Sequence, residues 1–281
     1  MKVDVSKYLA DYFPDLKVST MEVRNLENKK VDEALEKEKR KIEADIRNNA
    51  KDYLESETIK KYSLFFKKFE KKYPIEYQIK SIASGKSFPS QYTVVEAMFM
   101  AELKNMYLTA SHDLDLIKGS LNTKITKGNE EYVNISGKEM KLKPEDITTE
   151  DEFGIISSVL FGPDRRTMIT EKTKNYLFFA YYPYGEDNTK IRNHFEDIIK
   201  YINIFNILCN SHCDASSVLA DWSPLGRGKT VRMAATIWST TSVPLTTLPK
   251  TASPQPWADG AVWFRKPLSA TLMKNCAVAE C

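Results

Sequence analysis

DRRTMITEKTKNYLFFAYY, residues 164–182, is the stretch of sequence that decides the fold. Its second half, YLFFAYY at 176–182, is a dense run of aromatic and aliphatic residues, which are enriched in β-strands. Its first half is polar and rich in threonine, a composition typical of turns and caps. The stretch therefore predicts a threonine-rich turn that leads into a strand of the core.

Outside this stretch the signals alternate between strand and helix. Residues 155–161 form a second dense apolar run, and Gly128-Asn129 and Ser136-Gly137 are typical turn pairs between strands. The expected strands include 3–5, 17–23, 155–161 and 176–182, and the expected helices are 8–13, 31–46, 59–73, 92–103 and 191–205. This pattern predicts a mixed, layered α/β fold, a sheet with packed helices that is preceded by a helical N-terminal region.

The predicted helix at 59–73 has an aromatic face and a basic face. Its rings share one helical stripe with Ile59, which favours packing in the core. The opposite face is rich in lysine, so the helix could also combine lysines with stacking rings against RNA. We expect the rings to pack in the core and the lysines to make nonspecific phosphate contacts. The RNA-binding candidates are Lys67, Lys68, Lys71 and Lys72.

Four segments, in order along the chain, resemble the B3/B4 editing domain of the phenylalanyl-tRNA synthetase beta subunit. They are SFPSQYTVVEAMFMAEL at 87–103, SHDLDLIKG at 111–119, TKITKGNEEYVNISGK at 123–138 and DRRTMITEKTKNYLF at 164–178. The part upstream resembles free-standing members of the family, so the likeness runs from the N-terminus to about residue 205. The resemblance implies a B3/B4-like core, a partner that is tRNA, aminoacyl-tRNA or a free amino acid, and no metal or other cofactor.

In that family a histidine and a glutamate help to hold the substrate and the hydrolytic water. The resemblance places Ala110 at the histidine position, Phe179 at the glutamate position, and Phe99 where the helix usually carries asparagine. His112 stands two residues beyond the family position. Two classes of function remain open. The first is a trans-acting deacylase that hydrolyses misacylated aminoacyl-tRNA, and the second is a module that binds tRNA or an amino acid without catalysis.

His112 is the candidate catalytic residue, and Asp113 beside it is a candidate for substrate binding. The carboxylate is expected to raise the pKa of the imidazole, and the histidine could then orient a water molecule or an amino group. The alternative is a loop histidine that caps the turn at 113–118.

The other substrate-binding candidates lie in the threonine-rich turn. Arg165 and Arg166 could clamp a phosphate or a carboxylate through paired hydrogen bonds, or could form a solvated charged turn. Three hydroxyl groups and one amide could bind the amino acid and its ester, or could serve as turn and cap groups. They belong to Thr167, Thr170, Thr173 and Asn175, and for Asn175 closure of the turn is the favoured interpretation.

Net charge does not by itself indicate an RNA-binding protein. The chain has 41 Lys/Arg and 38 Asp/Glu; residues 207–281 hold seven and four of these, so residues 1–206 hold 34 of each. Any tRNA contact therefore needs a local basic patch. The start of the chain lacks the apolar run, about 7 to 15 residues long, of a signal peptide, and no run is long enough to span a membrane. A cytoplasmic location without membrane contact is expected.

Composition changes near residue 206. All four Cys and all four Trp lie beyond it, whereas all fourteen Tyr lie before it, and the later segment shows no sustained helical or strand period. This tail is either a disordered extension or sequence foreign to the original reading frame, and its Trp and Cys content favours the second. The expected organisation is a strand-helix region at 1–75 packed on a B3/B4-like core at 76–206, with an atypical tail at 207–281.

Overall fold

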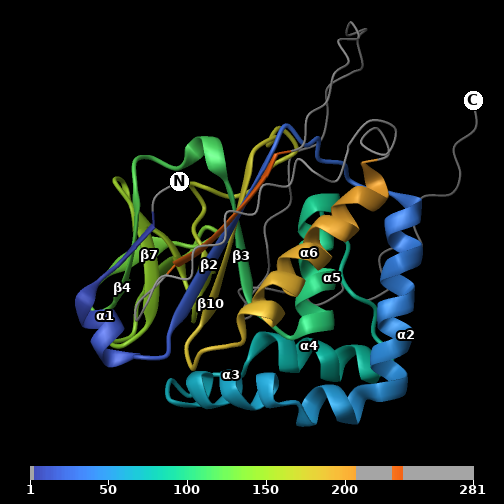
Figure 1. Cartoon of the computed structure of the whole chain (residues 1–281), viewed down its shortest axis with the longest axis horizontal. Helices are drawn as coiled ribbons and strands as arrows, with labels where there is room; N and C mark the ends of the chain where they lie inside the picture. Colours follow the sequence, from blue (N-terminus) through green and yellow to red (C-terminus); the bar gives the residue numbers. More distant parts are fainter. Residues whose placement is uncertain (1–2, 207–229, 237–281) are drawn as a thin grey trace, which may run out of the picture.

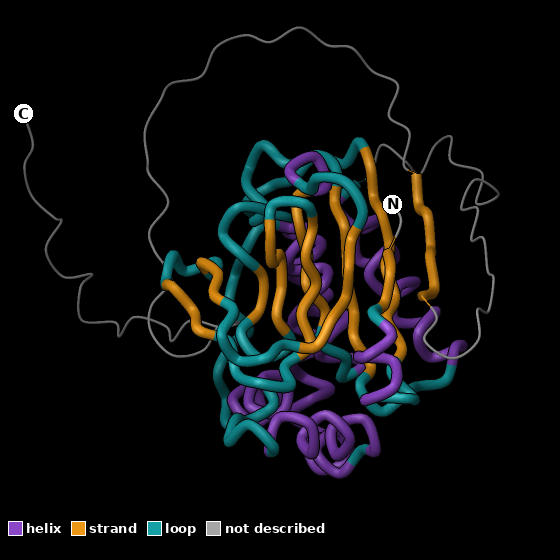
Figure 2. Tube along the Cα trace, turned by 90° about the vertical axis from the view of Figure 1, so that its left-hand side faces the viewer, coloured by secondary structure: helices purple, strands orange, loops and turns teal. Residues whose placement is uncertain are grey.

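The computed structural model describes residues 3–206 and the backbone of residues 230–236. Its elements form three layers: a five-stranded sheet, a four-stranded sheet, and helices on the far side of the second sheet (Figure 1). Figure 2 shows the strands in front and the helices behind and below them. The predicted mixed α/β class is confirmed.

The five-stranded sheet has the strand order β1-β4-β7-β8-β9. β1 pairs in parallel with β4, and the other pairs are antiparallel. The bounds are β1 Val3–Val5, β4 Leu121–Ile125, β7 Ile147–Asp151, β8 Gly154–Ser158 and β9 Gly162–Pro163. A separate hairpin joins β5 (Glu131–Val133) to β6 (Glu139–Lys141), and Gly137 in its turn has a φ of +83°, which glycine adopts most readily.

The four-stranded sheet has the order β11-β2-β10-β3. Its bounds are β2 Lys17–Arg24, β3 Thr109–Asp113, β10 Tyr176–Tyr182 and β11 Thr230–Thr236. The predicted strand at 176–182 is confirmed, and every residue of β10 is buried because the strand has neighbours on both edges and layers on both faces. β11 is a strand that the sequence did not predict; the rest of the tail, and the interpretations placed on it, lie outside the described residues.

Hydroxyl groups connect the two larger sheets. Tyr181 on β10 donates a hydrogen bond to Thr149 Oγ1 on β7 at 2.7 Å, and its phenol oxygen lies 2.6 Å from Ser157 Oγ on β8. Tyr181 therefore faces the five-stranded sheet. Because side chains alternate along a strand, Phe179 and Leu177 face the same way.

The helical layer is built around α5. Its helices are α2 Glu33–Glu55, α3 Glu57–Lys67, α4 Pro74–Ala83, α5 Thr93–Asn105 and α6 Asn188–Phe205. The short helix α1, Lys7–Tyr12, contacts β4 and lies apart from them (Figure 1), and a 3-10 turn, η1, spans Leu114–Leu116. α5 contacts α2, α4, α6 and β3, so it is buried on nearly every side. This explains why the segment from 92 to 103 is apolar with little periodicity.

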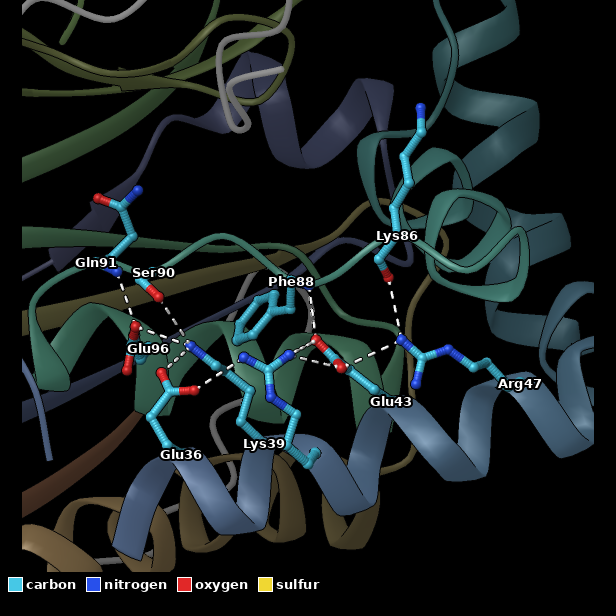
Figure 3. Close-up of polar contacts among 10 residues, drawn as sticks. Glu36, Lys39, Glu43, Arg47, Lys86, Phe88, Ser90, Gln91 and Glu96 are labelled. Carbon is cyan, nitrogen blue, oxygen red and sulfur yellow. Dashed lines mark hydrogen bonds and ion pairs between the residues drawn. The ribbon is translucent and has the colours of Figure 1, made fainter. Parts of the chain in front are cut away.

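A buried ion pair and a hydrogen bond join α2 to α5 and to the segment that leads into it (Figure 3). Lys39 Nζ lies 3.1 Å from Glu96 Oε1, and both side chains are almost fully buried. One α-turn further on, the carboxylate of Glu43 accepts the backbone N–H of Phe88 at 2.7 Å and pairs with the guanidinium group of Arg47. These contacts fix the N-terminal helix against the segment that leads into α5.

The predicted helix at 59–73 is wrong in its extent. α3 ends at Lys67, Glu70 has a left-handed φ of +58°, and α4 begins at Pro74. The left-handed Glu70 ends the helix: its N–H bonds to Lys67 O and the N–H of Lys71 bonds to Phe66 O, each at 3.1 Å, which is the pattern of a helix C-terminal cap.

The four candidate lysines consequently do not share one helical face. Lys68 Nζ lies over the rings of Phe13 and Tyr184, each at 5.5 Å. Lys71 Nζ lies 4.2 Å from the centre of the Phe161 ring, and burial lowers the pKa of this lysine. Lys67 and Lys72 are exposed.

The predicted strand at 155–161 is wrong in its extent: β8 ends at Ser158, and a turn separates it from β9, which begins at Gly162. Asp146 holds this turn, since its carboxylate accepts hydrogen bonds from Ser158 Oγ at 2.5 Å and from Leu160 N at 3.3 Å. An apolar run cannot reveal such a turn, because the carboxylate that stabilises it lies 12 residues away along the chain from Ser158.

Candidate functional site

β3 carries the candidate catalytic residue into the space between the two larger sheets. Its register pairs Ala110 with Phe179 and His112 with Leu177 on β10. Alternation puts these four residues on the face that Tyr181 also occupies, toward the five-stranded sheet. Asp113 follows on the opposite face of β3. A shift of two residues along the strand has therefore kept the histidine on the face where the family resemblance places one.

His112 is fully buried, and one of its two ring nitrogens has a partner. Nδ1 lies 2.8 Å from Thr167 Oγ1. Within the described residues, Nε2 is buried without a hydrogen-bond partner. The Thr167 hydroxyl in turn contacts Asp164 Oδ1, which also accepts the Thr167 N–H at 3.1 Å. The result is a buried chain from Asp164 through Thr167 to the imidazole.

Burial and, to a smaller extent, the positive charge of Arg166 lower the pKa of His112 to about 3, while Asp151 acts against this shift. The expected rise caused by Asp113 is wrong, since that carboxylate lies on the other face of β3. The alternative of a loop histidine that caps a turn is also wrong. Asp113 is itself the cap, because its Oδ1 accepts the N–H of Asp115 at 3.1 Å at the start of η1.

The two arginines diverge and do not form one clamp. Arg166 donates to Leu116 O at 2.9 Å and to Asp151 Oδ1 at 2.8 Å, so it ties η1 to the end of β7. Arg165 is exposed and lies against the β5–β6 turn, where a Cβ on Gly137 would approach its Nη1 to 2.7 Å. The donors of Arg166 are used largely within the fold.

The remaining candidates bond to one another and to η1. Thr173 Oγ1 donates to Asp113 Oδ2 at 2.6 Å and accepts the N–H of Thr170 at 3.0 Å. Asn175 donates to the Asp115 carboxylate at 2.9 and 3.0 Å and accepts the N–H of Asn25 at 3.1 Å. These contacts order the loop at 164–175 and fasten it to the end of β3.

Aromatic packing occupies the positions where the resemblance implies polar groups. Phe179 is fully buried, and its ring centre lies 4.8 Å from that of Tyr181. Phe99 packs edge-on against Phe88, with ring centres 6.0 Å apart, in the helical layer. Ala110 is also buried, so its small side chain leaves room for the neighbouring phenylalanine.

Sequence reasoning missed Asp164 and Asp151. Asp164 stands three residues before Thr167, a spacing at which an aspartate commonly accepts the backbone N–H of the later residue, so a local signal existed. Asp151 is 15 residues from Arg166, and only the tertiary fold brings the two together at 2.8 Å.

Two further observations concern the described residues alone. Their His, Cys, Asp and Glu side chains form no group of three that could hold a metal ion. None of their helices combines the length and the apolar character needed to cross a membrane.

The family match to known proteins falls in the later part of residues 3–206. The family model of the B3/4 domain matches residues 85–198. A phenylalanine-tRNA ligase beta subunit from Mycoplasma pneumoniae is 34% identical over 79 residues, which is 28% of this chain and 10% of that protein. The corresponding subunit from Mycoplasma genitalium is 37% identical over 67 residues, 24% of this chain and 8% of that protein.

A structural comparison gives a weaker likeness. It pairs the chain with an N-terminal fragment of the phenylalanyl-tRNA synthetase beta subunit from Pyrococcus horikoshii at a TM-score of 0.40 and 12% identity. The match covers 73% of this chain and 49% of the fragment. In the two Mycoplasma beta subunits, the match to this chain spans about a tenth of the length of each protein.

Proposed function

Because this chain carries a B3/4 domain over residues 85–198 and is related there to the tRNA synthetase machinery, we propose that it is a trans-acting deacylase of misacylated aminoacyl-tRNA. In such a reaction water adds to the ester carbonyl carbon, the bond to the ribose oxygen breaks, and that oxygen takes up a proton. The ester is reactive already, so the protein needs to orient the water and to stabilise the developing oxyanion.

One observation carries the proposal: His112 lies on the same face of β3 as Ala110, and its Nε2 has no partner within residues 3–206. A buried polar atom without a partner costs free energy, and a catalytic role that involves a bound water is one explanation for its retention. With a pKa of about 3 the imidazole is neutral near pH 7, so it can accept a hydrogen bond from water. It is too weak a base to hold a proton at that pH.

A binding module without catalysis is the second candidate, and the aromatic packing favours it. Phe179 fills space opposite Ala110, and the donors of the 164–175 loop are largely used within the fold. Such a module would contact phosphates through exposed lysines such as Lys67 and Lys72, with no requirement for His112.

Deacylation of a panel of mischarged tRNAs tests the enzyme. We expect the wild-type chain to hydrolyse at least one pair above buffer, and His112→Gln to lower that rate by a factor on the order of 100 or more. His194→Gln is the matched control, because His194 is equally buried and also has one ring nitrogen without a partner among the described residues, but it lies on α6 against the start of β3, away from the face that carries His112. Thermal melting of both variants separates lost folding from lost chemistry.

Absence of hydrolysis for every pair would eliminate the deacylase. Filter binding of uncharged tRNA at several salt concentrations then tests the module. The Lys67→Glu/Lys72→Glu variant should bind more weakly with a shallower salt dependence, since fewer phosphates are contacted.

A further inference from the structure

His112, Thr167 and Asp164 form a hydrogen-bonded chain that the proposed chemistry has not yet explained. All three residues are buried, and they come from β3 and from the loop that follows β9. The contacts are Nδ1 to Oγ1 at 2.8 Å, and Oγ1 to the carboxylate of Asp164. Their spacing along the chain, 55 residues between the histidine and the threonine, shows that the tertiary fold builds this arrangement.

Which group donates in each of these hydrogen bonds follows from the protons that Asp164, Thr167 and His112 carry. Asp164 faces donors, since Oδ1 accepts the Thr167 N–H at 3.1 Å and Oδ2 lies 3.7 Å from Arg166 Nε. The Thr167 hydroxyl has a single proton, and the carboxylate accepts it. Burial raises the pKa of Asp164 while its donors Thr167 and Arg166 act against this shift. With the carboxylate ionised, Thr167 Oγ1 accepts the proton that His112 carries on Nδ1. The lone pair of the imidazole is therefore on Nε2, the nitrogen without a partner in the described residues.

We propose that Asp164 and Thr167 are positioning residues that hold His112 in its neutral, Nδ1-protonated form and so present Nε2 as a hydrogen-bond acceptor to the ligand. The identity of the ligand group rests on the proposed function: the donor accepted there is the hydrolytic water. A nitrogen that accepts cannot also donate to the carbonyl oxygen of the ester. The donors for the oxyanion must therefore be other groups, which separates the roles within the site.

Nuclear magnetic resonance of the full chain labelled with ¹⁵N in histidine tests this directly. Long-range ¹H–¹⁵N correlations show which ring nitrogen carries the proton, and the chain has three histidines, so His112→Gln and His194→Gln assign the signals. We expect His112 to be protonated on Nδ1 and bare on Nε2, with no change between pH 8 and pH 5, because burial holds its pKa near 3.

Variants at the threonine provide the second readout. Thr167→Val removes the acceptor and should shift His112 toward the Nε2-protonated form, whereas Thr167→Ser should restore the wild-type spectrum. Thr109→Val is the matched control, because Thr109 Oγ1 lies 2.7 Å from His194 Nε2 and its loss should move the His194 signals alone. With a mischarged tRNA, Thr167→Val should slow deacylation by a factor on the order of 100, as a misplaced catalytic group does.

Once the His112 signals are assigned, the wild-type spectrum decides the matter even if neither variant at Thr167 folds. A proton on Nε2 of His112, or an imidazolium at pH 6, overturns the proposal, and so does a Thr167→Val spectrum identical to that of the wild type. The expected spectrum without hydrolysis of any tRNA leaves the positioning role standing and removes the deacylase. Hydrolysis of a mischarged tRNA by a chain whose His112 carries its proton on Nε2 leaves the deacylase standing and removes the positioning role.

Discussion

Replacement of Lys39 by methionine tests whether the buried ion pair at the start of α5 stabilises the fold. Lys39 and Glu96 expose only 1% and 2% of their side chains, and their charged atoms are 3.1 Å apart. At an effective dielectric constant of about 20 the attraction is worth roughly 5 kcal/mol. Removing one partner of such a pair typically costs about 3 to 5 kcal/mol. We expect about 3 kcal/mol for Lys39→Met, because Glu96 keeps the hydrogen bond from Gln91 N at 2.8 Å and can take up a proton.

The other contacts of Lys39 and Glu96 predict how the loss of stability differs between the variants. Glu96→Gln should cost less than Lys39→Met, because Lys39 keeps its ion pair with Glu36. The double variant Lys39→Met/Glu96→Gln should cost less than the sum of the two single variants, because no unpaired charge is left behind. Lys41→Met is the control: Lys41 also pairs with a glutamate, but its side chain is 74% exposed, so we expect less than about 1 kcal/mol.

The pH dependence has a definite sign. Burial raises the pKa of Glu96 even with Lys39 present, so the folded state holds this proton more tightly than the unfolded state. Loss of Lys39 raises that pKa further. Stability is then lost as pH rises through the folded pKa, and the deficit of Lys39→Met should be smaller at pH 5 than at pH 8. Urea unfolding at both pH values measures it. A deficit below about 1 kcal/mol at pH 8, or strict additivity in the double variant, would refute the reasoning.

Three further changes have outcomes that the structure specifies. Burial raises the pKa of Asp146 to about 7. The unfolding free energy of the wild type should therefore fall by about 4 kcal/mol relative to that of Asp146→Asn as the pH rises from about 4 through 7. Urea unfolding measures both free energies, and a parallel dependence on pH in the two proteins would contradict this. Phe179→Ala should cost about 3 to 5 kcal/mol of unfolding free energy, whereas Phe153→Ala, at a ring that is 71% exposed, should change it by less than about 0.5 kcal/mol. Arg166→Gln should cost about 1 to 3 kcal/mol in the same assay and Arg165→Gln less than about 0.5, and equal effects would mean that the two side chains do not differ as described.

The parts of the fold that sequence predicted well are those that depend on neighbouring residues. The strand at 176–182 was identified from its own side chains, and the turn at Gly137 from its own backbone requirement. The helix at 59–73 failed because a buried stripe indicates which residues face the core and not whether the backbone remains helical. Phe69 and Tyr73 are buried as expected although both lie beyond the end of α3.

The candidate site shows the same division between local and distant contacts. The bonds among Thr170, Thr173 and their near neighbours follow from turn chemistry and could be expected from spacing alone. The lowered pKa of His112 could not, because it is caused by burial between two sheets and by the charge of Arg166, which is distant along the chain. Sequence placed a charged neighbour beside the histidine, but strand alternation turned that neighbour to the opposite face.

Alternation also limits where any reaction could occur. A displacement of two residues keeps a side chain on the same face of a strand but moves it by about 7 Å along the sheet. His112 is therefore displaced from Ala110 and Phe179 toward the end of β3, where Arg166 joins η1 to β7. A ligand that uses Nε2 must place its reacting ester at this end, beside the 164–175 loop. Phe179 is fully buried and fills the position implied by the family resemblance, so its bulk would exclude a ligand from that position.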